Sequence, residues 1–343
     1  MNASTAIGGV MPAEPAGAPT ADSIWNAWRA DFPHHAAFAN ARSALAALLR
    51  FRRIRRVWLP AYVCGAVADA AVTAEVAARY YGVGLALEPD CAALERELSP
   101  GDAVVIVAYF GRPPHDAWCD LTARRPETLF IEDRAQALDA GAASLADTVI
   151  YSPRKLLGVA DGGLLFSHTP LPAPAGLAND GLWAPQDARA TDPDGLAPQR
   201  WRSLFTAAEE AMHAGDTAAT ARTLAALSST SIGPIAHARR ANWRSLAETL
   251  APWVLWPETA PGFAPLAFPI LTADAALAVA ALAESRIWAP RHWASLPSDP
   301  AAFPEAHRLA ATCVSLPIDQ RYGPVEMGRI IEAVTNCVPR YPR

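Results

Sequence analysis

The chain has 343 residues, of which 52% are apolar and only 18% are charged, and its net charge at pH 7 is −5. A chain of this size can bury a large core, either as two domains or as one large α/β unit. The acidic balance argues against a general nucleic-acid-binding protein and against a protein that binds anionic membranes. No apolar stretch of the sequence approaches the roughly 18 residues that a membrane-spanning helix needs.

The first 22 residues are rich in Ala, Pro and Gly, and this composition predicts a flexible N-terminal arm. The arm has neither a basic start nor a long apolar segment, so we do not expect a secretory signal. Five scattered cysteines without CxxC spacing favour reduced thiols and argue against a zinc site. We therefore expect a cytoplasmic protein without a bound metal.

Helical and strand-like segments alternate from Ser23 to about Phe166. The sequence predicts a helix over 43–50, with a serine as its N-cap, and an amphipathic segment over 91–98. Short runs that are apolar on both faces, as in a buried parallel sheet, occupy residues 57–59, 104–108, 129–131, 149–151 and 164–166. These patterns predict an α/β fold with a mostly parallel central sheet flanked by helices.

The second half of the chain differs in composition. Residues 168–200 are rich in Pro, Ala, Asp and Gly, which predicts a loop or linker. Further elements are expected in chain order: helices over 201–227 and 235–250, a strand over 266–271, and helices over 274–284 and 324–334. We therefore expect a large domain over 23–227, followed by a connector helix and a smaller C-terminal α/β domain over 228–343.

Open parallel sheets usually present their sites at the carboxyl ends of their strands. At one such end the sequence places Glu132 and Asp133, with Gln136 three residues beyond Asp133. A carboxylate there could act as a general base, bind a metal ion or pair with a cationic heterocycle. The alternative is that it only caps the next helix.

Lys155 is the single lysine among the 29 basic residues of the chain. It follows the predicted strand over 149–151 and precedes a Leu-Leu pair and the turn at Gly162-Gly163. A lysine in this position could act as a nucleophilic amine, whereas the delocalised guanidinium of arginine cannot form an imine. The alternative is an ordinary surface lysine.

A third segment, residues 40–43, opens a predicted helix whose free backbone N–H groups could bind a phosphate, although any capped helix offers the same groups. An amine, a carboxylate and a phosphate site together are what pyridoxal phosphate requires. A side chain that stacks on the cofactor ring is also expected, and Tyr62, Cys64 or Tyr109 could provide it. Dinucleotide binding is disfavoured because no G-x-G-x-x-G follows a strand.

The order of these segments resembles the DegT/DnrJ/EryC1/StrS family of pyridoxal-phosphate-dependent sugar aminotransferases, of fold type I. The resemblance runs from about Asn40 to Val334, with a gap through the Pro-rich middle. The segments that carry it are ANARSALAALL, VWLPAYVCGAV, VVIVAYFG, LFIEDRAQAL, YSPRKLLGVADGGLL, RRANWRSLAETL and CVSLPIDQRYGPVEMGRII.

The resemblance implies a homodimeric aminotransferase with a small-molecule amino donor, typically glutamate, and a keto sugar as acceptor. The sugar is expected to be linked to a nucleotide and to serve polysaccharide or secondary-metabolite biosynthesis. By the same resemblance, Lys155 would form the Schiff base and shuttle the proton, and Asp133 would pair with the pyridinium nitrogen. The other implied cofactor contacts are Gln136 near the 3-hydroxyl, Ser152, Arg42 and Ser43 at the phosphate, and Tyr62 or Cys64 on the ring.

The chain departs from the family pattern at three places. Arg134-Ala135 stands where a histidine is usual, and Ser152 lies one residue closer to Lys155 than in many members. The segment that supplies an asparagine to the neighbouring subunit has no match in residues 228–235. The alternatives are a cofactor-binding pseudoenzyme with a regulatory or assembly role, or another pyridoxal-phosphate reaction on a non-sugar substrate. A sugar dehydratase is disfavoured, because related dehydratases typically have histidine in place of the lysine.

Overall fold

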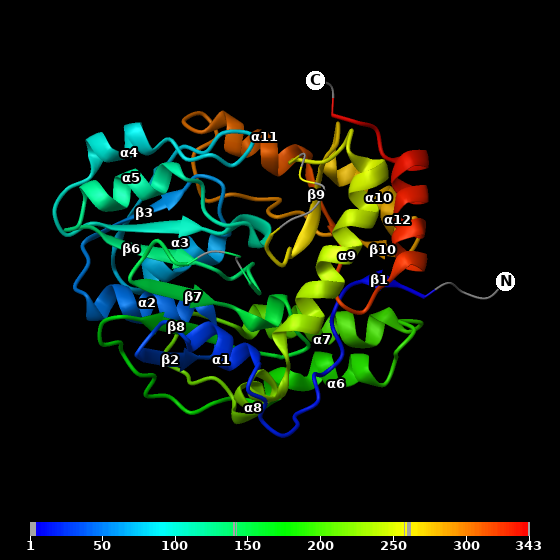
Figure 1. Ribbon diagram of the computed structural model, residues 1–343, viewed down its shortest axis with the longest axis horizontal. Helices are drawn as coiled ribbons and strands as arrows, with labels where there is room; N and C mark the ends of the chain where they lie inside the picture. The colour runs from blue at the N-terminus through cyan, green and yellow to red at the C-terminus, as the bar shows by residue number, and fades with distance from the viewer. Residues whose placement is uncertain (1–4, 140, 142, 257, 259–261, 342–343) are drawn as a thin grey trace.

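The computed structural model describes residues 5–139, 141, 143–256, 258 and 262–341. Its largest feature is a seven-stranded sheet in which β8 runs antiparallel to both of its neighbours while all other neighbouring strands are parallel (Figure 1). In spatial order the strands are β2 (His34–Phe38), β8 (Gly163–Ser167), β7 (Thr148–Tyr151), β6 (Leu129–Asp133), β5 (Ala103–Val107), β3 (Arg56–Pro60) and β4 (Ala77–Tyr81). The expected α/β fold with a mostly parallel sheet is confirmed.

Apolar side chains leave the sheet on both faces, as the continuous apolar runs predict. Ile150 and Leu165 belong to the core on the side of helix α2 (Ala41–Phe51), while Val149 and Phe166 belong to a second cluster. The second cluster also holds residues of α1 (Ile24–Arg29), α8 (Ala221–Ser229) and α9 (Ile232–Leu250). Because successive strand residues point to opposite faces, this division shows that helices cover both faces of the sheet.

Three further helices surround the sheet: α3 (Gly65–Thr73), α4 (Cys91–Glu97) and α5 (Ala117–Arg124). Two short sheets lie in the C-terminal part, where β9 (Ala267–Leu271) pairs antiparallel with β11 (Cys313–Pro317) and β1 (Ile7–Gly8) pairs parallel with β10 (Ile287–Trp288). The helices of this part are α10 (Ala275–Glu284), α11 (Pro304–Thr312) and α12 (Pro324–Cys337).

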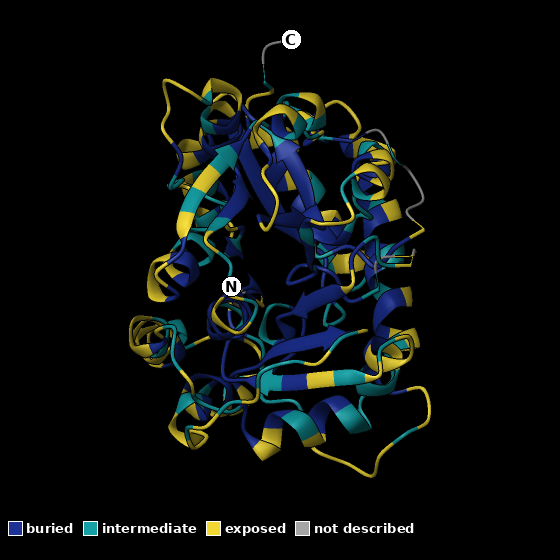
Figure 2. Ribbon diagram, turned by 90° about the vertical axis from the view of Figure 1, so that its left-hand side faces the viewer, coloured by how far each residue is buried: buried dark blue, intermediate teal, exposed yellow. Residues whose placement is uncertain are grey.

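Within the large sheet the sequence prediction missed β2 and β4, which lie at its edges. Outside this sheet it also missed β1, β10 and β11. Each edge strand mixes exposed, partly exposed and buried residues, whereas β5 and β8 are buried throughout. In Figure 2 the inner strands are buried, and exposed residues lie mainly on the outer faces of the helices. The edge strands were missed because the prediction relied on runs that are apolar on both faces.

The predicted loop over 168–200 and helix over 201–227 are both corrected by the structure. The segment contains a short 3-10 turn, η3 (Asp180–Trp183), and helix α6 (Ala184–Ala190). Helix α7 (Pro198–Ala211) then ends at Ala211, and α8 starts only after Thr220, whose hydroxyl caps it. The buried carboxylate of Asp161 accepts hydrogen bonds from the backbone N–H (2.7 Å) and the hydroxyl (3.0 Å) of Thr220. This contact fixes the start of α8 and separates it from α7.

The N-terminal segment is also corrected, because residues 6–14 of the predicted flexible arm mostly pack against the rest of the chain, while residues 15–19 are exposed. Ile7 is fully buried and pairs with Ile287. The backbone N–H of Glu14 donates to the carbonyl of Gly158 at 2.8 Å, close to the segment that carries Lys155. The arm therefore forms part of the surroundings of Lys155.

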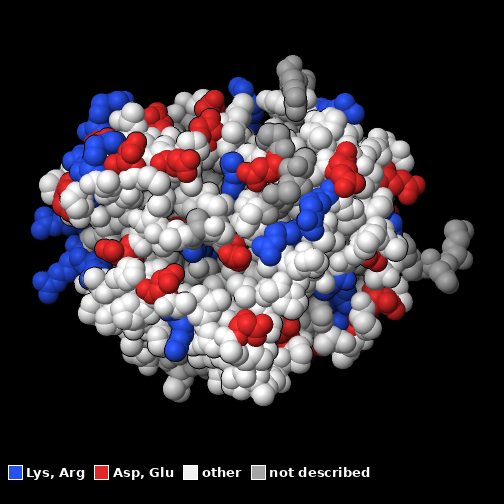
Figure 3. Space-filling view, in the orientation of Figure 1, with Lys and Arg blue, Asp and Glu red and all other residues white. Residues whose placement is uncertain are grey.

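Charged side chains of both signs are spread over the face seen in Figure 3. The arginines at 50, 53 and 55 are exposed at the end of α2 and the following turn, as expected for a solvated helix end, and Arg56 pairs with Asp102 at 2.7 Å. Among the described residues there is no cluster of three or more potential metal ligands, and no helix in this part of the chain is long and apolar enough to cross a membrane.

Gly162 and Gly163 let β8 approach the start of α2. Gly162 has a φ of +112°, and its neighbour Asn40 is the N-cap of α2. A Cβ atom on Gly163 would lie 2.0 Å from the carbonyl carbon and oxygen of Asn40. Real Cβ contacts are never so short, so only glycine lets the strand and the helix start meet here.

We expect Gly163→Ala to lower the free energy of unfolding by about 2 kcal/mol or more, because the added methyl must push backbone apart. Gly328→Ala is the matched control, since Gly328 lies within α12 with nothing within 4 Å of the new Cβ atom, and it should gain up to about 1 kcal/mol. Urea unfolding of both variants measures the difference. Equal effects would refute the close approach of β8 to α2.

Candidate active site

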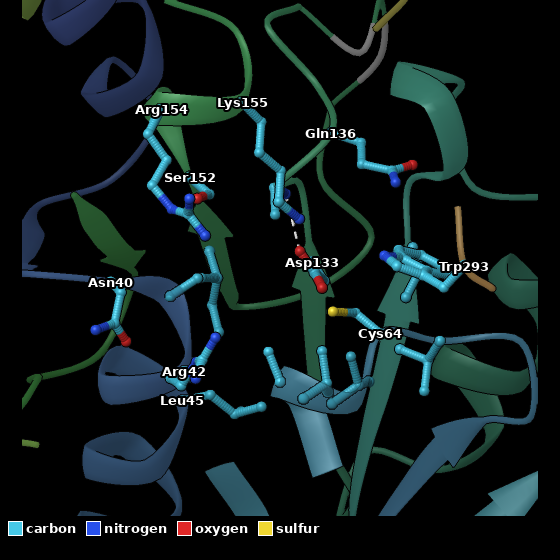
Figure 4. A pocket seen from close by; sticks show the side chains of 18 of the residues that line it. Asn40, Arg42, Leu45, Cys64, Asp133, Gln136, Ser152, Arg154, Lys155 and Trp293 are labelled. Carbon is cyan, nitrogen blue, oxygen red and sulfur yellow. Dashed lines mark hydrogen bonds between the residues drawn. The ribbon is translucent and has the colours of Figure 1, made fainter. Parts of the chain in front are cut away.

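A cavity opens at the carboxyl ends of β5, β6 and β7 and reaches the amino end of α2 (Figure 4). Carboxyl ends of neighbouring parallel strands share one edge of a sheet, so the cavity lies where the fold is expected to present a site. Its polar and titratable lining residues, together with its single tryptophan, are Asn40, Arg42, Cys64, Asp133, Gln136, Ser152, Arg154, Lys155, Glu209 and Trp293.

Asp133 and Lys155 lie in this cavity together. Asp133 is the last residue of β6, and Lys155 ends the short turn η2 (Pro153–Lys155) that follows the neighbouring strand β7. Burial raises the pKa of Asp133, while the positive charge of Lys155 and the N–H of Ala135, which donates to Asp133 Oδ1 at 2.8 Å, lower it. The predicted amine and the predicted carboxylate are therefore electrostatic neighbours.

Glu132 points to the other face of the sheet, as strand alternation requires. Its buried carboxylate accepts from Arg134 Nε at 2.6 Å and from Ser144 Oγ at 2.8 Å. Arg134 also donates to the hydroxyl of Tyr151 at 3.2 Å. Arg134, which stands at the usual histidine position, thus neutralises a buried carboxylate below the site, and Asp133 is the acidic residue of the pair that faces the cavity.

The carboxamide of Gln136 has one satisfied end and one unsatisfied end. Its Oε1 atom accepts from the backbone N–H of Phe110 at 2.6 Å. Its Nε2 atom is buried and has no hydrogen-bond partner within the described part of the chain. A buried amide nitrogen without an acceptor is costly, so this orphaned donor in the cavity wall indicates an acceptor atom on a bound molecule.

The first turn of α2 forms one end of the cavity. Asn40 is its N-cap and accepts from the Ser43 N–H at 2.8 Å, so the expected serine cap is an asparagine cap. The Ser43 hydroxyl donates to Asn40 at 2.9 Å and accepts from the Gly215 N–H at 3.0 Å. Ser43 does not line the cavity, whereas Arg42 does. Of the groups expected to bind an anion, Arg42 and the amino end of α2 therefore face the cavity, whereas the hydroxyl of Ser43 does not.

Two charged residues of the cavity were not predicted, Arg154 and Glu209. Arg154 precedes Lys155 directly, and its Nη2 atom donates to Glu209 Oε2 at 3.2 Å, with Nη1 contacting Oε1 as well. Glu209 lies on α7, far from the predicted motifs in the sequence. The position of Arg154 beside the lone lysine was a usable signal, but nothing in the sequence placed Glu209 in the site.

The candidates for the ring-stacking position separate in the structure. Cys64, the N-cap of α3, lines the cavity. Tyr62 is buried outside the lining, where its carbonyl accepts from the Tyr109 hydroxyl at 2.6 Å. Trp293 also lines the cavity, and its ring lies 5.4 Å from that of Tyr62. Of the three predicted candidates, only Cys64 therefore lines the cavity, while Tyr62 and Tyr109 do not. Trp293 is a further candidate that the sequence did not indicate.

His292 lies beside this group. Its Nδ1 atom is 2.7 Å from Ser315 Oγ. Burial, together with the positive charge of Lys155, lowers the pKa of His292 to about 3. The imidazole is therefore neutral near pH 7 and adds no further positive charge near Lys155.

The backbone directly after Lys155 is held by a buried arginine from α9. Arg239 Nη2 and Gln320 Nε2 each donate to the carbonyl of Leu156 at 3.0 Å. Arg239 also donates to the carbonyl of Leu266 at 2.9 Å. Burial without a directly bonded carboxylate lowers the pKa of Arg239 to about 10. These contacts tie the lysine-bearing turn to the C-terminal part, which no sequence motif indicated.

No protein-family model matches the sequence, and no match was found among curated proteins. Solved structures do match along nearly the whole chain. A DegT DnrJ EryC1 StrS aminotransferase from Brucella abortus is 18% identical, covers 91% of this chain and 87% of its own, and has a TM-score of 0.65.

Two further structures agree with this match. The putative sugar aminotransferase Spr1654 from Streptococcus pneumoniae in its PMP form is 14% identical, with coverages of 93% and 91% and a TM-score of 0.68. DesI in the presence of its TDP-sugar product is 17% identical, with coverages of 97% and 94% and a TM-score of 0.67. The chain therefore has the fold that the sequence resemblance predicted, the fold of these aminotransferases.

Proposed function

We propose that this protein is a pyridoxal-phosphate-dependent aminotransferase that moves an amino group from an amino acid to a keto sugar. One observation carries the proposal: the only lysine of the chain and the carboxylate of Asp133 line one cavity whose other end presents Arg42 and the amino end of α2. Similarity in fold to sugar aminotransferases supports the choice of this reaction among those the cofactor permits.

The described residues fit the cofactor. The amine of Lys155 would bind its aldehyde carbon, the carboxylate of Asp133 its ring nitrogen, and the helix amino end with Arg42 and Ser152 its phosphate. The orphaned Nε2 atom of Gln136 would donate to the ring oxygen and so gain the acceptor that it lacks. Each requirement of the group is thus met by a side chain that already lines the cavity.

When bound, the cofactor supplies a carbonyl carbon that exchanges amines and a ring that delocalises the electrons of a broken C–H bond. The amine of Lys155, once released, removes the proton from the amine-bearing carbon of the donor and later returns a proton to the acceptor carbon. The carboxylate of Asp133 would stabilise positive charge on the ring nitrogen. Trp293 and Cys64 also line the cavity in which this chemistry would take place.

We propose a nucleotide-linked keto sugar as acceptor and glutamate as donor. The acceptor is inferred from DesI, which was crystallised in the presence of its TDP-sugar product. The enzyme is proposed to act as a homodimer, because α7 exposes the apolar side chains of Leu204 and Phe205 (39% and 37% exposed) beside the site.

The chain's single lysine makes the cofactor attachment directly testable. Incubation with pyridoxal phosphate followed by borohydride reduction should add one cofactor, and peptide mass spectrometry should locate it on Lys155. Lys155→Arg keeps the charge but removes the nucleophilic amine, so it should give no adduct at this peptide and no visible absorption band. An adduct that persists in the variant would exclude Lys155 as the attachment site.

Asp133→Asn should lower the rate of amino transfer by roughly a hundredfold or more, because a neutral amide no longer stabilises the charge on the ring nitrogen. Cofactor affinity should change far less, since the other contacts remain. Stopped-flow measurement of the first half-reaction, with affinity measured by fluorescence quenching, separates the two effects. A loss confined to affinity would show that Asp133 only binds the cofactor.

The reaction itself is tested in two halves. Glutamate added to the cofactor-loaded protein should remove the visible band and release one 2-oxoglutarate per site, and a TDP-linked keto sugar should then restore the band and give an aminated sugar. Retention of the band with every amino acid tested would identify a cofactor-binding protein without transferase activity. Restoration by keto acids but not by keto sugars would identify a non-sugar acceptor.

A further inference from the structure

The cavity is electrically polarised along its length. In Figure 4, Asp133 and Lys155 lie in the middle, and the carboxamide of Gln136 lies to one side with Trp293. On the opposite side the figure groups Asn40, Arg42, Ser152 and Arg154. Two guanidinium groups, a hydroxyl and a helix amino end therefore gather away from the carboxylate of Asp133, and a ligand with a strongly anionic end would bind in this direction.

The two guanidinium groups differ in what they contact. Arg42 has no hydrogen bond or ion pair to any described residue. Arg154 is paired at both terminal nitrogens with Glu209, while its Nε atom is buried without a partner in the described structure. The Arg154 side chain is 16% exposed and that of Glu209 is 33% exposed, so solvent weakens the pair more at its carboxylate end.

We propose that Arg154 is a phosphate ligand of the cofactor and that Glu209 is a built-in competitor, which holds Arg154 in the free protein and is displaced by the phosphate. The proposal rests on the proposed function, because it assigns two more residues to the cofactor site. It differs from the sequence expectation, which gave the phosphate only Arg42, Ser43 and Ser152.

The exchange is favoured by charge and by geometry. A phosphate monoester carries between one and two negative charges near pH 7 and three acceptor oxygens, against one charge and two oxygens on a carboxylate. A guanidinium binds either group with two parallel hydrogen bonds, so Arg154 can change partners without losing bidentate contact. Arg154 precedes Lys155 directly, and the same short turn therefore brings the amine and the guanidinium to the cofactor.

The displaced carboxylate also links the cofactor to α7. Phe205 and Thr206 of this helix line a second cavity that adjoins the first at Arg154 and Lys155. Its wall includes the aromatic rings of Trp201 and Trp288 and contains no carboxylate among its described lining residues. Release of Glu209 by the phosphate would free the end of α7 beside this second cavity, so that cofactor loading would alter the wall that the two cavities share.

The test compares pyridoxal phosphate with pyridoxal, which has the same ring and aldehyde without the phosphate. Dissociation constants are measured by quenching of tryptophan fluorescence, and inorganic phosphate serves as a third ligand. Arg154→Gln should weaken pyridoxal phosphate at least tenfold and leave pyridoxal within about twofold. Glu209→Gln should tighten both pyridoxal phosphate and inorganic phosphate several-fold, because the competing carboxylate is lost.

Glu210→Gln is the matched control, since it makes the same charge change one residue along α7, at an exposed position outside both cavities. It should change the affinity for pyridoxal phosphate less than twofold. Circular dichroism checks the fold of each variant. If Arg154→Gln does not fold, the affinity of Glu209→Gln for pyridoxal phosphate still tests the proposal.

The proposal is overturned if Glu209→Gln weakens pyridoxal phosphate or leaves it unchanged, because Glu209 would then support the site or take no part in it. It is equally overturned if Arg154→Gln weakens the two aldehydes alike. Failure of the proposed function has a different signature: no borohydride-trapped adduct on Lys155, or no amino transfer, in the unaltered protein.

Discussion

The register between β6 and β7 is the constraint on which the candidate site depends. Asp133 at the end of β6 is opposite Ile150, so the chain that leaves β7 passes the Asp133 carboxylate at once, places Lys155 beside it and brings Ser152 and Arg154 into the same cavity. A shift by one residue would exchange Asp133 with Glu132, whose carboxylate serves Arg134 on the other face. The parallel direction of the two strands brings both groups to one edge of the sheet.

The surroundings hold this register in place from three directions. Gly163 lets β8 touch the start of α2, which positions Asn40 and Arg42 opposite Asp133. Arg239 and Gln320 fix the carbonyl after Lys155, and Glu14 of the N-terminal segment contacts Gly158 just beyond it. The lysine-bearing turn is therefore held by hydrogen bonds from distant parts of the sequence, which limits the positions that the amine can reach.

Much of this was predictable from the sequence, and the failures have physical reasons. Buried parallel strands have continuous apolar runs, so β5, β6, β7 and β8 were found and with them Asp133, Gln136, Ser152 and Lys155. Edge strands and the short helix α6 lack that signal and were missed. Ser43 and Tyr62 have suitable chemistry but their side chains point elsewhere, while Glu209 and Trp293 reach the cavity through tertiary packing alone. Local pattern predicts which element carries a residue, but not which side chain from a distant element meets it.

Because the chain has only one lysine, its arginines and its lysine can be assigned different roles in and around the cavity. Arginine serves wherever the chain needs a fixed cation: Arg134 contacts Glu132 under the sheet, Arg239 holds the turn after Lys155, and Arg42 and Arg154 lie at the cationic end of the cavity. A guanidinium stays protonated and binds planar anions with two hydrogen bonds, but it cannot serve as the amine of an imine or as a base for a carbon-bound proton. The one lysine of the chain stands at the position where the proposed reaction requires a neutral amine to be formed. In a chain otherwise built on arginine, the position of its one lysine beside Asp133 is the strongest argument that the cavity is a site of amine chemistry.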